Sequence, residues 1–370
     1  MSDIENKLNP RSLSDTDFDR LVYLRLFEGC NLYCDHCFIP SNPKKMSDEL
    51  IASVPDLIRS FSPSDAKVLI QWHGGEPTAL GRDHLQSALE ALDKEKGDLT
   101  FTHGIQTNLM NYTSEWADLY HRYFDGQVGI SWDYKIRKKH GSDNADSFEA
   151  AFWPNLEQLL KDGLQPYFVV TGTKLFFERF KNPFELFEFF ESRGVYHLHI
   201  ERLTEVGNAR HNWSEIGVNN KEYSDYMSRL YKGYKIYSEL HKNRDSIRLS
   251  PFDGLDESVT RLLSGQSGGY GCLSGSCDTK YHTIDANGYK PGCTALNSET
   301  DNKVIHGDVQ PLMIFDPAAT RVERQVSCEG CQYQPICSSG CLALTKIDES
   351  NECSGAWTLF NTIERHHKLT

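Results

Sequence analysis

The sequence lacks any segment that directs a protein to a membrane or through one. None of its 370 residues falls in a run approaching the ~18 consecutive apolar residues that span a bilayer. The first twenty residues are polar and lack the apolar stretch of a signal peptide. Basic residues are also few, 39 against 52 acidic, which gives a net charge of −13. This balance argues against a nucleic acid or an anionic membrane as partner, and we expect a cytoplasmic protein.

Cysteine, in contrast, is abundant. Three of the eleven cysteines lie near the start of the chain and eight lie beyond residue 271. In a reducing compartment, many cysteines more often indicate metal than disulfides. A disulfide protein with one cysteine left over is the alternative, and Cys328-x2-Cys331 alone would also suit zinc. The cysteine spacing and the missing export signal argue against the disulfide alternative, and the zinc interpretation leaves the N-terminal group Cys30, Cys34 and Cys37 unexplained.

The cysteines divide into three, four and four. A 4Fe–4S cluster normally takes four cysteine ligands. The N-terminal Cys-x3-Cys-x2-Cys group would therefore leave one iron open to a non-protein ligand, while the other eight cysteines could close two further clusters. One reactive iron centre and two closed ones are typical of a redox enzyme.

Short apolar runs alternate with amphipathic segments from residue 21 to about residue 205. The pattern predicts helices between six strands, at residues 21–27, 67–72, 99–107, 128–132, 166–172 and 196–203. Repeated strand–helix units of about 30 residues imply parallel strands with right-handed crossovers. Six units are too few for the eight-fold barrel, so we expect an α/β fold with a partial (β/α)6 barrel.

The composition changes towards the C-terminus, where Gly, Ser and Cys become frequent. We expect an N-terminal extension (1–20), the partial barrel (21–217), a bridging helical region (218–265) and a cysteine-rich domain (266–370). The last of these is expected to fold around metal rather than around a large apolar core.

The first strand leads into FEGCNLYCDHCF, which resembles the cluster loop of the radical S-adenosylmethionine (SAM) superfamily. Functional groups of parallel barrels lie on loops after the strands, as Cys30 does here. The resemblance implies that the open iron chelates the amino and carboxylate groups of SAM. Reductive cleavage of SAM would then yield methionine and a 5′-deoxyadenosyl radical that abstracts a substrate hydrogen.

Further motifs of that superfamily follow the next strands in order. The GGEP motif follows the second strand, Gln106-Thr107-Asn108 the third, and Ser-x-Asp the fourth. By this resemblance, the SAM contacts are Gly74, Gly75, Glu76, Pro77, Gln106, Asn108, Ser131, Asp133 and Arg137. Two positions depart from the family pattern: His36 replaces an aromatic residue expected to pack near adenine, and Tyr134 replaces a glycine on the substrate side.

The C-terminal cysteines resemble a SPASM domain with two auxiliary 4Fe–4S clusters, which brings the total to three. The resemblance implies that one auxiliary cluster is held by Cys272, Cys277, Cys293 and Cys341, and the other by Cys328, Cys331, Cys337 and Cys353. Complete thiolate ligation leaves no iron free for substrate, so we expect these clusters to carry electrons. A purely structural role is the alternative.

SPASM enzymes mostly modify peptides and proteins, so we expect a precursor peptide as substrate. The sulfatase-maturating branch carries an aspartate base directly after the cysteine equivalent to Cys293, but Thr294 stands here. That branch is therefore the runner-up. Only 29 residues precede Cys30, too few for the peptide-recognition domain of some relatives. A leader peptide is then expected to bind the barrel, the bridging region or a separate protein.

We predict a radical SAM peptide maturase that makes an intramolecular side-chain crosslink, with a C–C bond favoured and a thioether as the alternative. A flavodoxin or ferredoxin-like protein would supply electrons to a monomer. The competing class, a non-catalytic iron–sulfur carrier, does not need a SAM pocket. Residues 201–204, a polar strand end, are a further candidate contact with substrate or SAM. The sequence assigns no residue as the catalytic base.

Overall fold

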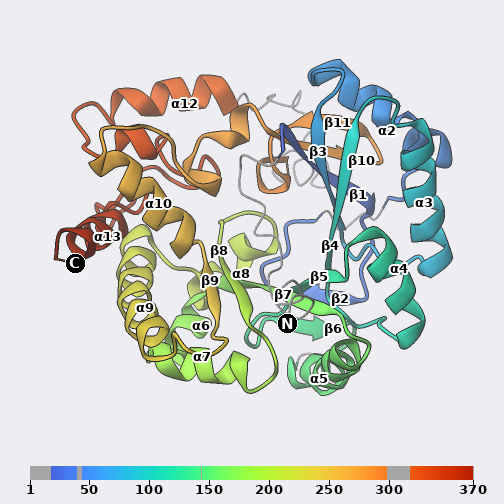
Figure 1. Cartoon of the computed structure of the whole chain (residues 1–370), viewed down its shortest axis with the longest axis horizontal. Coiled ribbons are helices and arrows are strands. Elements are labelled where there is room, and N and C mark those ends of the chain that lie inside the picture. The colour runs from blue at the N-terminus through green and yellow to red at the C-terminus, as the bar shows by residue number, and fades with distance from the viewer. Residues whose placement is uncertain (1–17, 40–43, 143, 298–316, 370) are drawn as a thin grey trace.

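A computed structural model describes residues 18–39, 44–142, 144–297 and 317–369. Six parallel strands curve around its centre, at the places that the sequence predicted (Figure 1). They are β1 (Arg20–Phe27), β3 (Lys67–Gly74), β4 (Thr100–Thr107), β5 (Gln127–Ser131), β7 (Gln165–Gly172) and β8 (His197–Arg202). The expected α/β partial barrel is confirmed.

Helices lie on the outside of these strands and at the C-terminal end of the chain (Figure 1). Ser47 caps the first of them by accepting a hydrogen bond from Leu50 N, and Asn182 caps another directly before Pro183. The helices are α2 (Asp48–Phe61), α3 (Arg82–Glu95), α4 (Ala117–Tyr123), α5 (Asp146–Lys161), α6 (Lys174–Arg179), α7 (Pro183–Glu191), α8 (Asn208–Ile216), α9 (Asn220–Leu240), α10 (Phe252–Leu263), α12 (Pro317–Val326) and α13 (Trp357–Leu369).

The sheet continues beyond the six predicted strands at both edges. Strand β9 (Arg248–Ser250) pairs in parallel with β8. At the other edge, β10 (Tyr281–Asp285) pairs in parallel with β1, and β11 (Gly288–Pro291) pairs antiparallel with β10. A hairpin of the cysteine-rich region is thus part of the barrel sheet, and it brings Cys293, two residues after β11, to the β1 edge.

A two-stranded sheet holds the predicted cluster loop. Strand β2 (Leu32–Cys34) lies within that loop and pairs antiparallel with β6 (Arg137–Lys139), which follows β5. Asp35 N also donates to Ile136 O at 3.0 Å. These bonds fix the loop against the segment that carries Asp133 and Arg137.

Side chains alternate between the two faces of each barrel strand. On β8, Leu198 and Ile200 are buried in the main hydrophobic core, which the helices share. His197, His199 and Glu201 occupy the opposite, inward face of the same strand. The same alternation on the other strands gives the barrel a polar interior, while the apolar face of the sheet packs against the helices.

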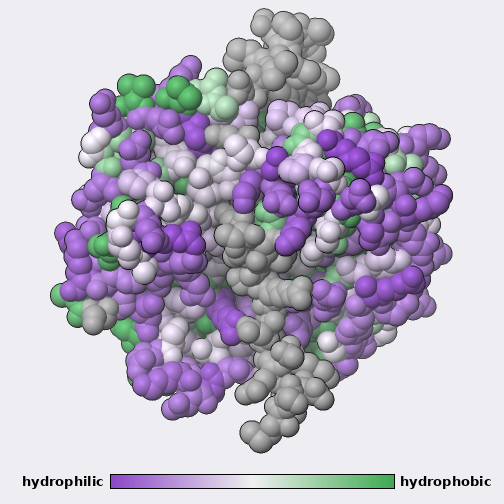
Figure 2. Space-filling model, turned by 45° about the horizontal axis from the view of Figure 1, so that its top comes forward, coloured by the Kyte–Doolittle hydropathy of each residue, from purple (hydrophilic) through white to green (hydrophobic). Residues whose placement is uncertain are grey.

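One face of the molecule is largely hydrophilic, with a small hydrophobic area over α12 at its upper left (Figure 2). Val322 and Val326 of α12 are exposed there. Among the described residues, no helix combines the length and the apolar character needed to cross a membrane.

Candidate cluster and cofactor site

The structure brings Cys30, Cys34 and Cys37 together on the loop after β1. Within the loop, Cys37 N donates to Cys34 O at 3.2 Å, and Leu32 N donates to Cys30 Sγ at 3.4 Å. From the end of β4, Asn108 Nδ2 lies 3.6 Å from the same sulfur. Burial raises the pKa of the Cys30 thiol to about 11. These thiols would therefore become thiolates on binding a positively charged metal group.

In the described part of the chain, the cysteine side chains do not converge on one point suited to a single metal ion. Tetrahedral zinc, with Zn–S bonds near 2.3 Å, would place its sulfurs roughly 3.8 Å apart. Over the described ranges, no three or more His, Cys, Asp or Glu side chains converge closely enough for one metal ion. The thiols nevertheless gather in the three groups that the sequence predicted.

A buried ion pair lies beside the N-terminal cysteines. Arg137 NH2 lies 2.6 Å from Asp133 Oδ2, and its NH1 lies 3.9 Å from Cys34 Sγ. Burial is the largest single influence and works against ionisation of Asp133, but the charges of Arg137 and His36 and the hydrogen bonds from Thr171 together lower the pKa of that carboxyl. His36 Nε2 lies 3.4 Å from the same carboxylate oxygen, so this departure from the family pattern sits in the site itself. Asp133 and Arg137 remain predicted SAM contacts.

Glu76 of the GGEP motif is buried and surrounded by hydrogen-bond donors. Its Oε1 accepts from Thr78 N, Thr78 Oγ1 and Thr107 Oγ1, and its Oε2 accepts from Asn108 N at 2.7 Å. The carboxylate thus joins the ends of β3 and β4. Its predicted contact with the SAM amino group would add to this role.

The two glycines of the motif allow close packing against the cluster loop. A Cβ on Gly75 would lie 2.3 Å from Glu28 O, and one on Gly74 would lie 2.2 Å from Phe27 O. Gly75 N and Glu76 N donate to Phe27 O and Gly29 O. A side chain at either glycine would therefore push the two loops apart. Pro77 follows them in the same loop.

The remaining predicted SAM contacts lie at the ends of β4 and β5. Gln106 Nε2 donates to Ser131 Oγ at 2.8 Å, and Asn108 Nδ2 donates to Asn31 Oδ1 of the cluster loop at 2.7 Å. Four successive strand ends thus surround the N-terminal cysteines. Sequence reasoning missed Gly207: a Cβ there would lie 2.3 Å from Cys37 O, and Asn208 N donates to that oxygen at 2.8 Å.

Four cysteines of the C-terminal region line one cavity of about 30 Å³. The aromatic side chains Tyr333, Trp357 and Phe360 form part of its wall. The four are those grouped by the sequence resemblance: Cys328, Cys331, Cys337 and Cys353. A cavity lined by four thiols and closed by aromatic rings fits a fully ligated cluster.

The other group of four centres on Cys277 and Cys293. A hydrogen bond between the two sulfurs raises the pKa of Cys277 and lowers that of Cys293. Cys272 and Cys341 both lie within electrostatic range of Cys277. The chain thus returns at Cys341 to the group that begins at Cys272, as the resemblance implied.

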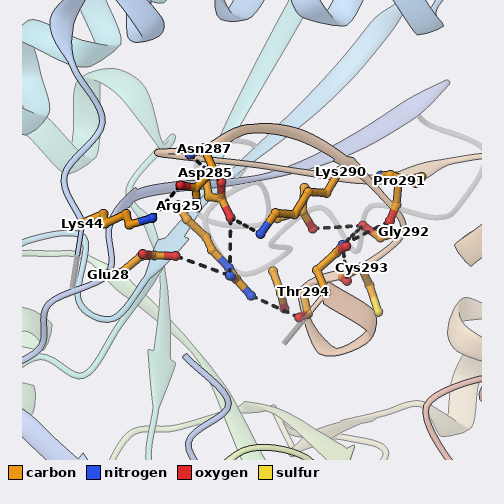
Figure 3. Close-up of polar contacts among 12 residues, drawn as sticks. Arg25, Glu28, Lys44, Asp285, Asn287, Lys290, Pro291, Gly292, Cys293 and Thr294 are labelled. Atoms are coloured by element: carbon orange, nitrogen blue, oxygen red, sulfur yellow. Dashed lines mark hydrogen bonds and ion pairs between the residues drawn. The ribbon is translucent and has the colours of Figure 1, made fainter. Parts of the chain in front are cut away.

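A buried charge network links the cluster loop to this second group (Figure 3). Arg25, on the inward face of β1, lies 3.5 Å from Glu28 Oε1 and 3.8 Å from Asp285 Oδ2 through its NH1. Its NH2 donates to Thr294 O at 3.1 Å, directly after Cys293. Lys290 Nζ lies 2.8 Å from Asp285 Oδ2. The sequence signal for this network is the arginine within the apolar run LVYLRLF.

Residues 201–204, the predicted polar contact, divide into different roles. Arg202 donates to Ser354 O at 2.8 Å, hydrogen-bonds the Asn220 side chain and lies over the Tyr223 ring. It therefore joins β8 to the residue after Cys353. Leu203 is buried, and Glu201 is half exposed at the mouth of the barrel.

Comparison with known proteins finds a family match for the part of the chain that carries the N-terminal cysteines. Residues 24–139 match the model of the radical SAM superfamily. An uncharacterized protein of Synechocystis sp. is 25% identical over 250 residues, and the match covers 63% of this chain and 62% of that protein. The cysteine-type anaerobic sulfatase-maturating enzyme of Clostridium novyi is 22% identical over 337 residues, 85% of each chain.

Two solved structures share the fold. The structure of anSMEcpe with bound AdoMet and the Cp18Cys peptide superposes with a TM-score of 0.68 at 19% identity, over 94% of this chain and 97% of that one. Streptococcus suis SuiB bound to S-adenosylmethionine gives a TM-score of 0.54 at 18% identity, over 88% and 73%. The fold class is thus the radical SAM partial barrel with a cysteine-rich C-terminal region. Within that fold, residues 24–139 are the part that matches the radical SAM superfamily.

Proposed function

We propose that this radical SAM enzyme oxidises an unactivated C–H bond in a ribosomally made precursor peptide and forms an intramolecular side-chain crosslink. A C–C bond is favoured and a thioether is the alternative product. The observation that carries the proposal is that Arg25 links the N-terminal cysteine group to a second group of four cysteines. The link is made at Thr294, which stands where the sulfatase-maturating branch has its base.

The residues present fit three 4Fe–4S clusters and SAM. When bound, these groups supply a 5′-deoxyadenosyl radical at the N-terminal cysteines and electron acceptors at the two C-terminal groups. The strand ends with Glu76, Gln106 and Ser131 would orient SAM, and Arg137 would place a positive charge beside the open cluster. The thiols of the closed groups would hold the auxiliary clusters on either side of Arg202.

A peptide substrate is supported by two structures of the same fold. One is anSMEcpe with a bound peptide, and the other is SuiB bound to precursor peptide SuiA, with a TM-score of 0.52 at 14% identity. The electron donor would be a flavodoxin or a ferredoxin-like protein, and the enzyme would act as a monomer.

Sulfatase-type maturation is the second candidate, favoured by the likeness to a sulfatase-maturating enzyme along most of the chain. Formylglycine formation needs a base beside the substrate Ser or Cys. At the expected position, Thr294 is buried, and its hydroxyl is not basic near neutral pH. We therefore rank it below crosslinking.

The experiment that separates the two uses anaerobically reconstituted enzyme, SAM, a reductant and two peptides. One is a synthetic sulfatase-motif peptide, which we expect to remain unchanged. The other is a short precursor peptide encoded beside the gene, in which mass spectrometry should show the loss of two hydrogens. The loss should resist thiol reductants, and fragmentation should be suppressed within the ring.

Formylglycine in the sulfatase-motif peptide would overturn this ranking. An unchanged precursor alongside abundant 5′-deoxyadenosine would contradict the peptide assignment while leaving the enzyme class intact.

A further inference from the structure

The inward face of β8 carries a hydrogen-bonded chain that ends at the mouth of the barrel. His199 Nε2 lies 3.1 Å from Glu201 Oε2, and His199 Nδ1 lies 2.9 Å from Ser250 Oγ on β9. Ser250 Oγ in turn lies 3.3 Å from the hydroxyl of Tyr270. Ser250 therefore fixes the His199 imidazole at the nitrogen that faces away from Glu201. The imidazole in turn holds the Glu201 carboxylate in one orientation.

Exposure increases along this chain towards the opening. The side chain of His199 is 22% exposed and that of Glu201 is 50% exposed. Burial is the largest single influence and disfavours the charged form of Glu201, but the hydrogen bond to His199, the His199 charge and a backbone hydrogen bond from Arg202 together lower the pKa of the carboxyl. The side chain is thus an ionised carboxylate at neutral pH, and a substrate in the barrel mouth could reach it.

Glu201 also lies near one particular cysteine group. Burial is the main cause of the raised pKa of Cys341, to which the Glu201 charge adds, and the same charge opposes ionisation of Cys293, although these two residues lie far from Glu201 in the sequence. Both cysteines belong to the group that also contains Cys277. A carboxylate beside several thiolates is electrostatically unfavourable, so a residue with only a packing role would be better neutral at this position.

The other titratable groups around Glu201 come from several elements. Burial raises the pKa of Tyr23 on β1, Tyr167 on β7 and Tyr223 on α9, so these phenols stay neutral. Arg202 points instead towards Ser354. Cys293 and Cys341 are predicted cluster ligands. Among these described neighbours, Glu201 is the one carboxylate available to accept a proton.

We propose that Glu201 is the base that accepts the proton lost by the substrate, with His199 as the residue that positions it. This rests on the proposed function. After the ring-closing bond has formed, the C–H bond at the new junction breaks. Its proton goes to the Glu201 carboxylate, and one electron goes to the oxidised iron–sulfur cluster held by the Cys272, Cys277, Cys293 and Cys341 group, which is thereby reduced.

The proximity of acceptor and base makes the two transfers help each other. An electron added near Cys293 increases the negative charge beside Glu201 and therefore strengthens its affinity for a proton. Glu201 would also act as the base that is missing at position 294, where a threonine stands. Glu201 lies on β8 and Cys293 follows β11, and these two strands lie towards opposite ends of the strand order in the sheet. The hairpin of β10 and β11 nevertheless makes Cys293 part of the barrel.

The coupling can be measured without a peptide. Holoenzyme with all its clusters would be titrated with redox mediators at several pH values between 6 and 8.5, with EPR as the readout. We expect the midpoint potential of one auxiliary cluster to fall with rising pH. The limit is ~59 mV for each tenfold change in proton activity in a one-electron step.

The variants Glu201→Gln and Glu201→Asp test the residue itself. Glu201→Gln should remove the pH dependence, whereas Glu201→Asp should retain part of it. His199→Gln should shift the pH at which it occurs. Glu205→Gln is the matched control, because this exposed carboxylate follows four residues later and should leave the dependence unchanged.

Three results would overturn the proposal. They are a wild-type potential that does not vary with pH, a dependence that survives in Glu201→Gln, and a Glu201→Gln protein that fails to hold its iron, which would assign a structural role. Cleavage of SAM without peptide is measured in parallel in the wild type and in the control Glu205→Gln, and it should persist in both. If even the wild type lacked this cleavage, the proposed function would fail instead.

Discussion

Arg25 NH2 donates a hydrogen bond to the backbone oxygen of Thr294 at 3.1 Å, although 269 residues separate them in the chain. The bond joins the strand that leads into the N-terminal cysteines to the residue after Cys293 (Figure 3). It gives the two cysteine groups a fixed relative position, and the parallel pairing of β10 with β1 reinforces it.

Replacing Arg25 should therefore destabilise the protein strongly. Arg25→Met would remove the buried cation between Glu28 and Asp285, and breaking a buried ion pair in this way typically costs about 3–5 kcal/mol. A large fall in the thermal midpoint is expected, together with a weaker signal from the auxiliary cluster at Cys293. The control is Arg59→Met, which loses an exposed pair with Asp56 worth about 0–1 kcal/mol. Similar shifts for both variants would contradict the role of the network.

The stability of the hairpin should depend on pH through His282. This residue stacks on Phe61, and burial, aided by the nearby Arg20 charge, lowers its pKa to about 4. The folded state binds the His282 proton less readily than the unfolded state. The contribution of the neutral imidazole to the free energy of unfolding is therefore fully present above pH ~6.5 and is lost as the pH falls towards 4. Thermal midpoints between pH 5.5 and 8 should therefore fall less steeply towards acid in His282→Phe. Parallel curves for the two proteins would disprove this.

Two residues of the predicted SAM pocket should respond differently to substitution. Ser131→Ala should weaken SAM binding, measured by calorimetry, with little effect on the thermal midpoint. Glu76→Gln should weaken binding and also lower the midpoint, because an amide cannot accept from all four surrounding donors and leaves some unsatisfied, at about 1–3 kcal/mol. Neither should change the iron content. Normal SAM affinity in both variants would show that these strand ends are not part of the SAM pocket.

The sequence predicted the parts of the fold that local patterns determine. Six strands with alternating or continuous apolar residues were found in place, because their periodicity directly reflects burial on the sheet. The division of the cysteines into an N-terminal three and a C-terminal eight was visible in the sequence, whereas the sorting of the eight into two groups came from the family resemblance and stays a prediction. The hairpin of β10 and β11 was not, because the YHTID segment is short and polar and is stabilised by pairing with a strand about 260 residues earlier.

The functional residues that were missed share that non-local character. Gly207 looks like an ordinary loop glycine until its contact with Cys37 O is seen. Arg25 lies in an apolar strand, and two of its partners, Asp285 and Thr294, lie some 260 residues later in the chain. Glu201 was noticed as a polar strand end, but only the fold brings it near Cys293 and beside His199 on an inward face. Residues of this kind acquire their surroundings from tertiary structure alone.

The most direct test of the account is the formation of 5′-deoxyadenosine by anaerobically reconstituted enzyme with SAM and dithionite. Wild-type protein should hold about 12 iron atoms and produce the nucleoside. The variant with Cys30, Cys34 and Cys37 all replaced by alanine should retain about 8 iron atoms, in the two C-terminal groups, and produce none. Nucleoside formation by that variant, or its absence from fully loaded wild-type protein, would contradict the account.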